Sequence, residues 1–193
     1  IENSFKKQKK LKFLNKFPLP KYLIRKINSN LDPFQPAGES AAWKYLNSFC
    51  NERVKGYAFD ISKPEKSRTS CSRLSPYISW GNLNIRLVYQ RLMQLKKNNK
   101  NLRSINAVIS RLHWHCHFIQ KFEVDCTHET DFINKGFDLL KRNNNLKYIK
   151  AWEDGQTGYP LIDANIRAVK KTGWINFRMR AMLVSFFVHN LDQ

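Results

Sequence analysis

The apolar residues between positions 105 and 122 limit the fold more than any other feature of the sequence. One set recurs with the period of a helix: Ile105, Val108, Ile109, Leu112, Cys116 and Ile119. A second set repeats every four residues on another face: Trp114, Phe118 and Phe122. A helix that is apolar on two faces is expected to lie at the centre of the protein.

Shorter segments with the same helical spacing surround this one, and no segment alternates as a strand does. The predicted helices start near residues 39, 85, 132, 162 and 179, whereas residues 51–75 are polar and predict a loop. Residues 1–36 are rich in lysine and contain four prolines, which is typical of a basic interdomain linker. Residues 37–193 therefore predict one all-α domain.

The charge of the chain favours a polyanionic partner. Lysine and arginine total 34 against 15 aspartate and glutamate residues, which gives a formal net charge of +19 at pH 7. No window approaches the roughly 20 apolar residues of a membrane span, and no signal peptide is recognisable, so no membrane is expected. The cysteines form no CxxC pair, which favours a reduced, cytoplasmic protein.

The ends of the chain suggest a piece of a larger protein. The sequence starts at Ile1 and ends at Gln193 directly after an apolar helical pattern. We therefore expect a fragment, whose uncovered apolar helix faces could cause association between copies.

Short hydroxyl side chains gather just before Pro76, at the predicted start of a helix: Thr69, Ser70, Ser72 and Ser75. Unpaired N–H groups at a helix start attract anions, so these residues could hold a phosphate. Ser75 followed by Pro76 also suits plain helix capping, which composition alone favours, and the spacing does not decide between the two interpretations.

Histidines also cluster, in the segment LHWHCHF. His113 and His117 are four residues apart and could share a metal ion on one helix face. No carboxylate motif accompanies them, so packing, hydrogen bonding or anion contacts are preferred and no metal is assigned.

Tryptophans and arginines offer a third interpretation. Trp114, Trp152 and Trp174 could stack on nucleic-acid bases, while Arg178 and Arg180 hold phosphates. For each tryptophan taken alone, packing in the core is the preferred role.

Three segments in the right order carry a resemblance to a known family. GESAAWKYLNSF, SRLSPYISWGNL and WEDGQTGYPLIDANIRAVKKTGWINFRMRAMLVSFF resemble the helical FAD-binding domain of photolyases and cryptochromes, over residues 37–193. The resemblance implies a partial all-α domain that binds FAD in a U-shape. It also implies a phosphate-binding turn made of Cys71, Ser72, Arg73, Leu74 and Ser75, with Tyr57 preceding it; Cys71 replaces the usual threonine.

The same resemblance assigns the remaining site residues. Trp114, the residue assigned to catalysis, matches a tryptophan that lies against a flipped pyrimidine dimer. His115 and Arg180 are implied near the flavin, and the nucleic-acid contacts are implied to be Arg111, Trp114, Trp174 and Arg178. The chain departs from the family at Arg111, which replaces a glutamate, at His115, which replaces an arginine, and at Phe177 and Ala181, which replace an asparagine and a methionine.

These matches imply a blue-light-dependent enzyme that repairs damaged DNA, in which excited reduced FAD gives an electron to a flipped pyrimidine photoproduct. The departures favour an alternative, a cryptochrome-type light sensor without repair. A flavin-free basic helical module that binds nucleic acid is a third hypothesis.

Overall fold

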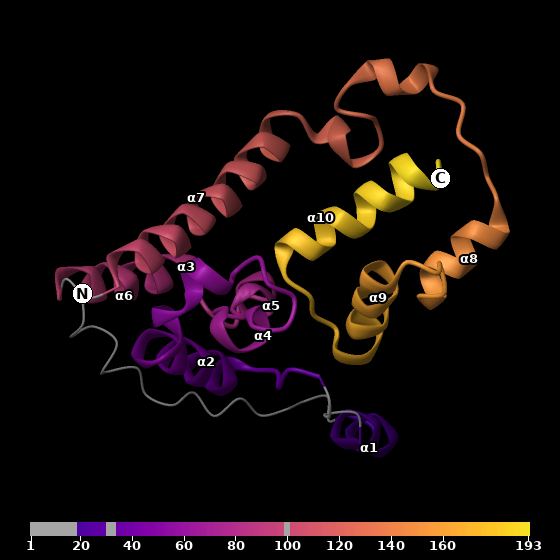
Figure 1. The fold of residues 1–193 in the computed structure, drawn as a ribbon. Coiled ribbons are helices and arrows are strands. Elements are labelled where there is room, and N and C mark those ends of the chain that lie inside the picture. Colours follow the sequence, from indigo (N-terminus) through magenta and orange to yellow (C-terminus); the bar gives the residue numbers. More distant parts are fainter. Residues whose placement is uncertain (1–18, 30–33, 99–100) are drawn as a thin grey trace. The chain divides into compact units, whose positions relative to one another are not determined.

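The computed structural model describes residues 19–29, 34–98 and 101–193 (Figure 1). The chain divides into two compact units, Ile1–Phe34 and Gln35–Gln193. The described part of the first unit contains one helix, α1 (Lys21–Ser29), which follows directly after Pro20. A linker role for residues 1–36 stays a prediction, and residues 1–18 lie outside the described part.

The first half of the larger unit packs four short helical turns against three longer helices. The long ones are α2 (Glu39–Asn51), α6 (Ile85–Lys97) and α7 (Leu102–Val124), and the short ones are η2 (Arg53–Lys55), α3 (Tyr57–Asp60), α4 (Ser67–Ser70) and α5 (Ser75–Ser79). Helix α6 packs on α7 and α2, and α3 packs on α7. The predicted helices near 39, 85 and 105 are therefore confirmed.

The prediction of a loop over residues 51–75 is wrong. The segment is mostly short helical turns, and it buries Val54, Tyr57, Ser67 and Leu74. These buried positions are too few and too unevenly spaced to produce a helical periodicity, because each turn contributes only one or two residues to the core.

The second half of the unit surrounds a separate core. Helix α9 (Pro160–Thr172) packs on α8 (Leu146–Asp154) and on α10 (Phe177–Ser185), which continues into the π-helical turn η5 (Phe186–Asn190). The buried residues are Ile162, Ile166, Ile175, Met179, Leu183 and Phe186. The helices predicted near 162 and 179 are confirmed, whereas α8 was not predicted.

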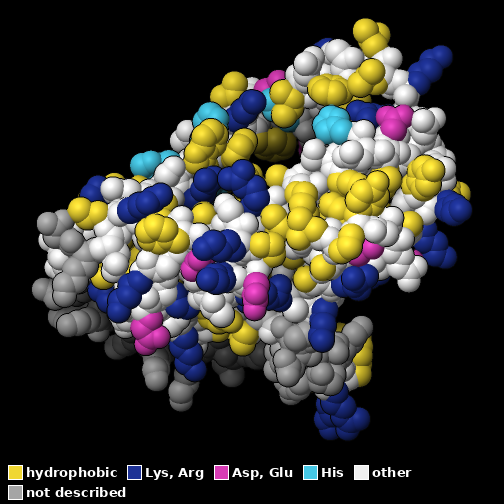
Figure 2. Space-filling view, in the orientation of Figure 1, with side chains coloured by type: hydrophobic (Ala, Val, Ile, Leu, Met, Phe, Trp, Pro, Cys, Tyr) yellow, Lys and Arg dark blue, Asp and Glu magenta, His cyan; other side chains and the backbone are white. Residues whose placement is uncertain are grey.

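Helix α7 is buried only over its first half. Ser104, Ile105 and Val108 are buried, but on the second face Trp114 is 49% exposed and Phe118 is 57% exposed. The prediction of a central helix is therefore wrong for its C-terminal half within the described residues. Figure 2 shows hydrophobic side chains at the surface of this view of the molecule.

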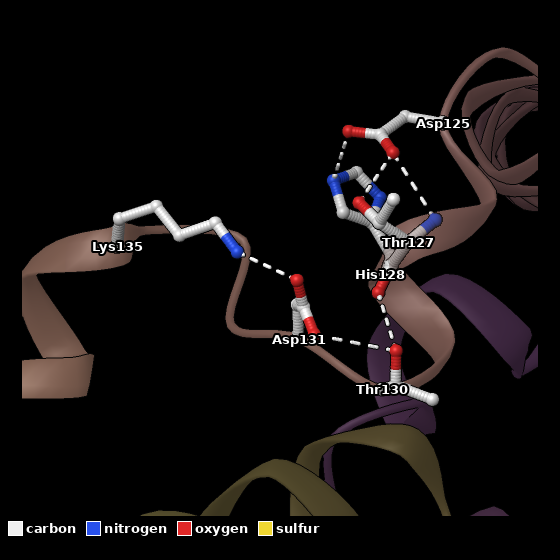
Figure 3. Close-up of polar contacts among 6 residues, drawn as sticks. All are labelled: Asp125, Thr127, His128, Thr130, Asp131 and Lys135. Atoms are coloured by element: carbon white, nitrogen blue, oxygen red, sulfur yellow. Dashed lines mark hydrogen bonds and ion pairs between the residues drawn. The ribbon is translucent and has the colours of Figure 1, made fainter.

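The segment after α7 is held by local polar contacts instead of a core (Figure 3). Asp125 Oδ1 accepts hydrogen bonds from Thr127 N at 3.1 Å and from Thr127 Oγ1 at 2.5 Å, and Lys135 Nζ lies 2.7 Å from Asp131 Oδ2. The helix predicted near 132 is wrong: the segment contains the 3₁₀ turns η3 (Cys126–Glu129) and η4 (Lys135–Leu139), and its apolar side chains, such as Leu139, are exposed.

The described helices include none that is both long and apolar enough to cross a membrane. All four cysteines are free. Within residues 19–29, 34–98 and 101–193, no three His, Cys, Asp or Glu side chains gather in a way that could hold a metal ion.

Candidate functional site

A cavity of about 510 Å³ lies where three segments of the larger unit meet. The segments are the turn 71–75, the middle of α7, and residues 174–180 at the start of α10 (Figure 1). Its lining consists of Tyr57, Ile61, Cys71, Ser72, Arg73, Leu74, Ser75, Arg111, Trp114, His115, Phe118, Trp174, Ile175, Asn176, Phe177 and Arg180. A volume of this size suits a small molecule or cofactor.

The turn 71–75 has an unusual backbone because Arg73 adopts a positive φ of 57°. Few residues other than glycine adopt this conformation without strain, so the surrounding contacts must hold it. Leu74 is buried beneath the turn, while Ser72 and Ser75 line the cavity. The backbone thus presents two hydroxyl side chains at the cavity wall.

Burial dominates the electrostatics of the cavity floor. Tyr57 is 5% exposed, and its burial raises the pKa of the phenol far above its ordinary value. Burial likewise raises the pKa of the Cys71 thiol to about 11. Both groups therefore stay neutral at pH 7 and leave the charge of the site to other side chains.

Helix α7 contributes an aromatic and cationic wall. Trp114 and Phe118 are one turn apart, and their ring centroids lie 5.7 Å from each other. Arg111 and His115 lie at the same four-residue spacing and also line the cavity. The Arg111 guanidinium lies 5.9 Å from the centroid of the Phe177 ring, and both side chains line the cavity.

The third wall is fixed by Asn176. Its side chain accepts a hydrogen bond from Met179 N at 2.8 Å, which caps α10, and donates one to Ser67 Oγ at 2.9 Å. Trp174 is buried, with the guanidinium of Arg73 stacked 4.7 Å from its ring. Asn176 thus joins the start of α10 to the turns of the first half.

The composition of the lining indicates the chemistry that the cavity accepts. Three arginines, one histidine and five aromatic side chains face it, and none of the described lining residues is acidic. A second cavity of about 780 Å³ shares Tyr57, Arg111, His115 and Arg180 with the first. This combination suits an anionic ligand that also carries flat rings.

All predicted site residues except one line this cavity: Tyr57, Cys71, Ser72, Arg73, Leu74, Ser75, Arg111, Trp114, His115, Trp174 and Arg180. Arg178 is exposed and lies outside the lining. Trp152 packs in the second core instead, where its Nε1 donates to Leu183 O at 3.3 Å.

Only two of the four hydroxyl residues before Pro76 line the cavity. Thr69 and Ser70 turn to local partners, Lys66 O and Asp60 Oδ2, whereas Ser72 and Ser75 line the cavity. Ser75 is the first residue of α5 and makes no capping hydrogen bond, so the capping interpretation is wrong. Helix α5 has only five residues, which gives it little macrodipole to add.

Five lining residues were missed as site residues: Ile61, Phe118, Ile175, Asn176 and Phe177, the last noted only as a departure from the family. Phe118 follows Trp114 at the helical spacing, and Asn176 precedes an apolar helix, where it is a typical cap. Both signals are visible in the sequence but indicate packing as readily as a site.

The comparisons with known proteins agree on one family. A sequence model described as the FAD binding domain of DNA photolyase matches residues 108–193. A deoxyribodipyrimidine photo-lyase of Alkalihalophilus pseudofirmus is 30% identical over 156 residues, which cover 80% of this chain and 31% of the relative. Cryptochrome-1 of Sinapis alba is 32% identical over 158 residues, 78% of this chain and 31% of the relative.

Solved structures show the same fold. A class III photolyase from Agrobacterium tumefaciens matches with a TM-score of 0.76 at 23% identity, over 91% of this chain and 35% of the other. A Synechocystis cryptochrome matches with a TM-score of 0.74 at 27% identity, over 81% and 32%. The all-α prediction is confirmed, and the chain spans about a third of the length of the curated relatives it matches.

Proposed function

Because the chain belongs to the photolyase and cryptochrome family and forms part of its FAD-binding domain, we propose that the cavity binds FAD for light-dependent repair of pyrimidine photoproducts in DNA. The observation that carries this proposal is a lining of three arginines and five aromatic side chains without a described carboxylate. A dinucleotide cofactor presents two phosphates and two flat ring systems, which match these two kinds of side chain.

An unpartnered buried atom supports the fit. Arg73 Nε is buried and has no hydrogen-bond partner among the described residues, in a turn whose hydroxyls line the cavity. A buried donor normally finds an acceptor, so a bound anion would complete the site. We assign the phosphates to the turn 71–75 with Arg180, and the rings to the aromatic wall.

When bound, reduced FAD would supply the light-driven electron transfer that cleaves the photoproduct. The residues of the chain bind, orient and exclude water. Trp114 and Phe118 offer exposed ring faces at the cavity, against which a base flipped out of the duplex would stack. Arg111 beside them would hold a carbonyl oxygen or a phosphate, and Arg178 outside the cavity would contact the DNA backbone.

One observation favours a second candidate, a cryptochrome-type sensor that binds FAD without repairing DNA. Arg111 places a cation close to Phe177 in the cavity lining, and neither side chain can accept a hydrogen bond from a lesion. Cryptochromes from Sinapis alba and Arabidopsis thaliana are also among the similar proteins, at 32% identity.

The first experiment is the visible absorption spectrum of the purified protein, with release and identification of any bound chromophore. Bound FAD supports the proposal, whereas a protein that is colourless and takes up no added FAD contradicts it. Blue-light repair of an oligonucleotide with one synthetic pyrimidine dimer then separates the candidates: FAD without repair supports the sensor.

A matched pair of substitutions tests the assignment of the cavity. Arg180 lines it and Arg178, two residues away, does not. Arg180→Gln should weaken FAD binding about tenfold, while Arg178→Gln should weaken only DNA binding. Equal effects of both substitutions on FAD would contradict the assignment.

A further inference from the structure

Arg53 holds the phosphate-facing turn from behind, although it does not line the cavity. Its guanidinium donates hydrogen bonds to the carbonyl of Cys71, to Tyr45 O at 2.7 Å and to Ser72 O at 3.4 Å. Its Nε donates to Ser48 Oγ at 3.0 Å. One side chain therefore joins α2 to two successive carbonyls of the turn.

These contacts fix the direction of the backbone N–H groups. In a trans peptide the C=O and the N–H point in opposite directions. Because the carbonyls of Cys71 and Ser72 point to Arg53, the N–H groups of Ser72 and Arg73 point away from it. Gln35 repeats the arrangement one residue later, since its Nε2 donates to Arg73 O at 2.8 Å, so Leu74 N–H points away from Gln35.

The freed N–H groups form an arrangement suited to an anion. Ser72, Arg73 and Leu74 donate no N–H hydrogen bond to any other part of the described chain. Arg73 has φ 57°, and Leu74 follows with φ −88° and ψ −12°. Successive residues of opposite helical hand curve their N–H groups around a common centre, which makes a concave anion site.

We infer that Arg53 is a positioning residue for the phosphates of the dinucleotide, an inference that rests on the proposed function. It touches no ligand but aims the N–H groups of the turn by holding their carbonyls. An arginine is required because its planar fork donates to several carbonyls at once, whereas a lysine offers a compact charge without this geometry.

The test compares two ligands of the purified protein, FAD and riboflavin, which lacks the phosphates. Arg53→Lys keeps the charge and should weaken FAD binding at least tenfold while riboflavin affinity changes less than twofold; Arg53→Ala should act in the same direction. Circular dichroism verifies that each variant is folded. The matched control is Arg167→Lys, because Arg167 Nη1 also donates to a backbone carbonyl, Gly155 O at 2.6 Å, but away from the cavity.

Each outcome is informative. Equal losses for FAD and riboflavin would make Arg53 a general structural residue and overturn the inference, as would unchanged FAD affinity in both variants. Inorganic pyrophosphate provides an independent measurement: it should raise the unfolding temperature of the wild type but not of Arg53→Lys. If the wild type binds FAD and Arg53→Lys does too, only this inference fails; if the wild type binds neither FAD nor pyrophosphate, the proposed function fails with it.

Discussion

The thiol of Cys71 lies at the cavity wall, where 8% of the residue is exposed. Burial raises its pKa from 9.0 to about 11, so the reactive thiolate is scarce at neutral pH. We expect iodoacetamide to modify exposed Cys126 quickly at pH 8 and Cys71 very slowly, with the Cys71 rate rising toward pH 11. Mass spectrometry of peptides measures both cysteines in one sample.

Binding of FAD provides a second test of the position of Cys71. Bound FAD should slow the modification of Cys71 further and leave Cys126 unchanged, because only Cys71 lines the cavity. Modification of Cys71 at pH 8 as fast as that of Cys126 would contradict the burial. The folded state holds the thiol proton more tightly than the unfolded chain, so this residue also makes stability fall as pH rises from about 9 to about 11.

Asp163 makes the stability of the protein depend on pH in the acid range, whereas Cys71 does so in the alkaline range. Burial raises its pKa, but hydrogen bonds from Thr157 Oγ1 at 2.6 Å, Thr157 N at 2.8 Å and Gly158 N at 3.0 Å outweigh burial, so the pKa lies below its ordinary value. Its contribution to stability is therefore complete above about pH 4 and is lost as pH falls below that value.

Asp163→Asn tests this contribution. The amide replaces one carboxylate oxygen with a donor, which would face the N–H of Gly158 or the two donors of Thr157, so we expect a loss of about 1–3 kcal/mol at pH 7. Urea unfolding at pH 7 and pH 3 measures the difference, which should shrink at pH 3 because the stabilisation by the carboxylate declines as pH falls below the ordinary aspartate pKa of about 4. A difference that is equal at both pH values would contradict the role of the charge.

The junction of α8 and α9 depends on a glycine that ends α8. Gly155 has φ 64°, and a Cβ added there would lie 3.0 Å from the backbone oxygen of Asp163. Gly158 also has a positive φ, 86°, but a Cβ there meets nothing within 4 Å. A side chain would therefore strain the backbone at both positions, but only at Gly155 would its Cβ also clash with another atom.

We expect Gly155→Ala to lower the free energy of unfolding by about 2–4 kcal/mol, and Gly158→Ala by about 1–2 kcal/mol. Urea titrations of both variants measure the difference. If both variants lost the same free energy of unfolding, the contact between Gly155 and α9 would contribute nothing, and the close approach in the structure would be contradicted.

The long helices could be predicted from the sequence, whereas the short turns could not. Helices α2, α6, α7, α9 and α10 were predictable because their apolar residues recur with helical spacing, although α7 buries this face only over its first half. The turns of residues 51–75 were not, since Val54 and Tyr57 are buried singly and their neighbours are polar. The helix predicted near residue 132 was wrong because Phe132 and Leu139 have the spacing of an apolar helix face, although both side chains are exposed.

The candidate site followed from family motifs more than from periodicity. Those motifs indicated Ser72, Arg111 and Arg180, all of which line one cavity. The role inferred for Arg53 could not be predicted, because it depends on which carbonyls the guanidinium reaches across 18 residues of chain. Such a contact leaves no local pattern in the sequence.

At the scale of the whole molecule, net charge should control the proposed binding to DNA. The chain carries a formal net charge of +19, and Lys and Arg side chains are spread over the face shown in Figure 2. Each phosphate contact releases a condensed counterion, so affinity for DNA should fall steeply and linearly on a plot of log K against log salt. A neutral surface with a single specific pocket would show a shallow slope instead.

Single arginines should change this slope by a fixed step. Arg178→Ala should weaken binding to damaged and undamaged duplexes alike and reduce the slope by about 1, since an exposed cation contacts phosphate but reads no base. Arg86→Ala, at an exposed residue of α6 outside the cavity lining, is the matched control and should leave the slope closer to that of the wild type. Fluorescence anisotropy at several salt concentrations measures both. If Arg178→Ala weakened binding to damaged DNA alone, the residue would recognise the lesion instead of the backbone. The proposed division between a cavity for FAD and the flipped base and an outer surface for the DNA phosphates would then be wrong.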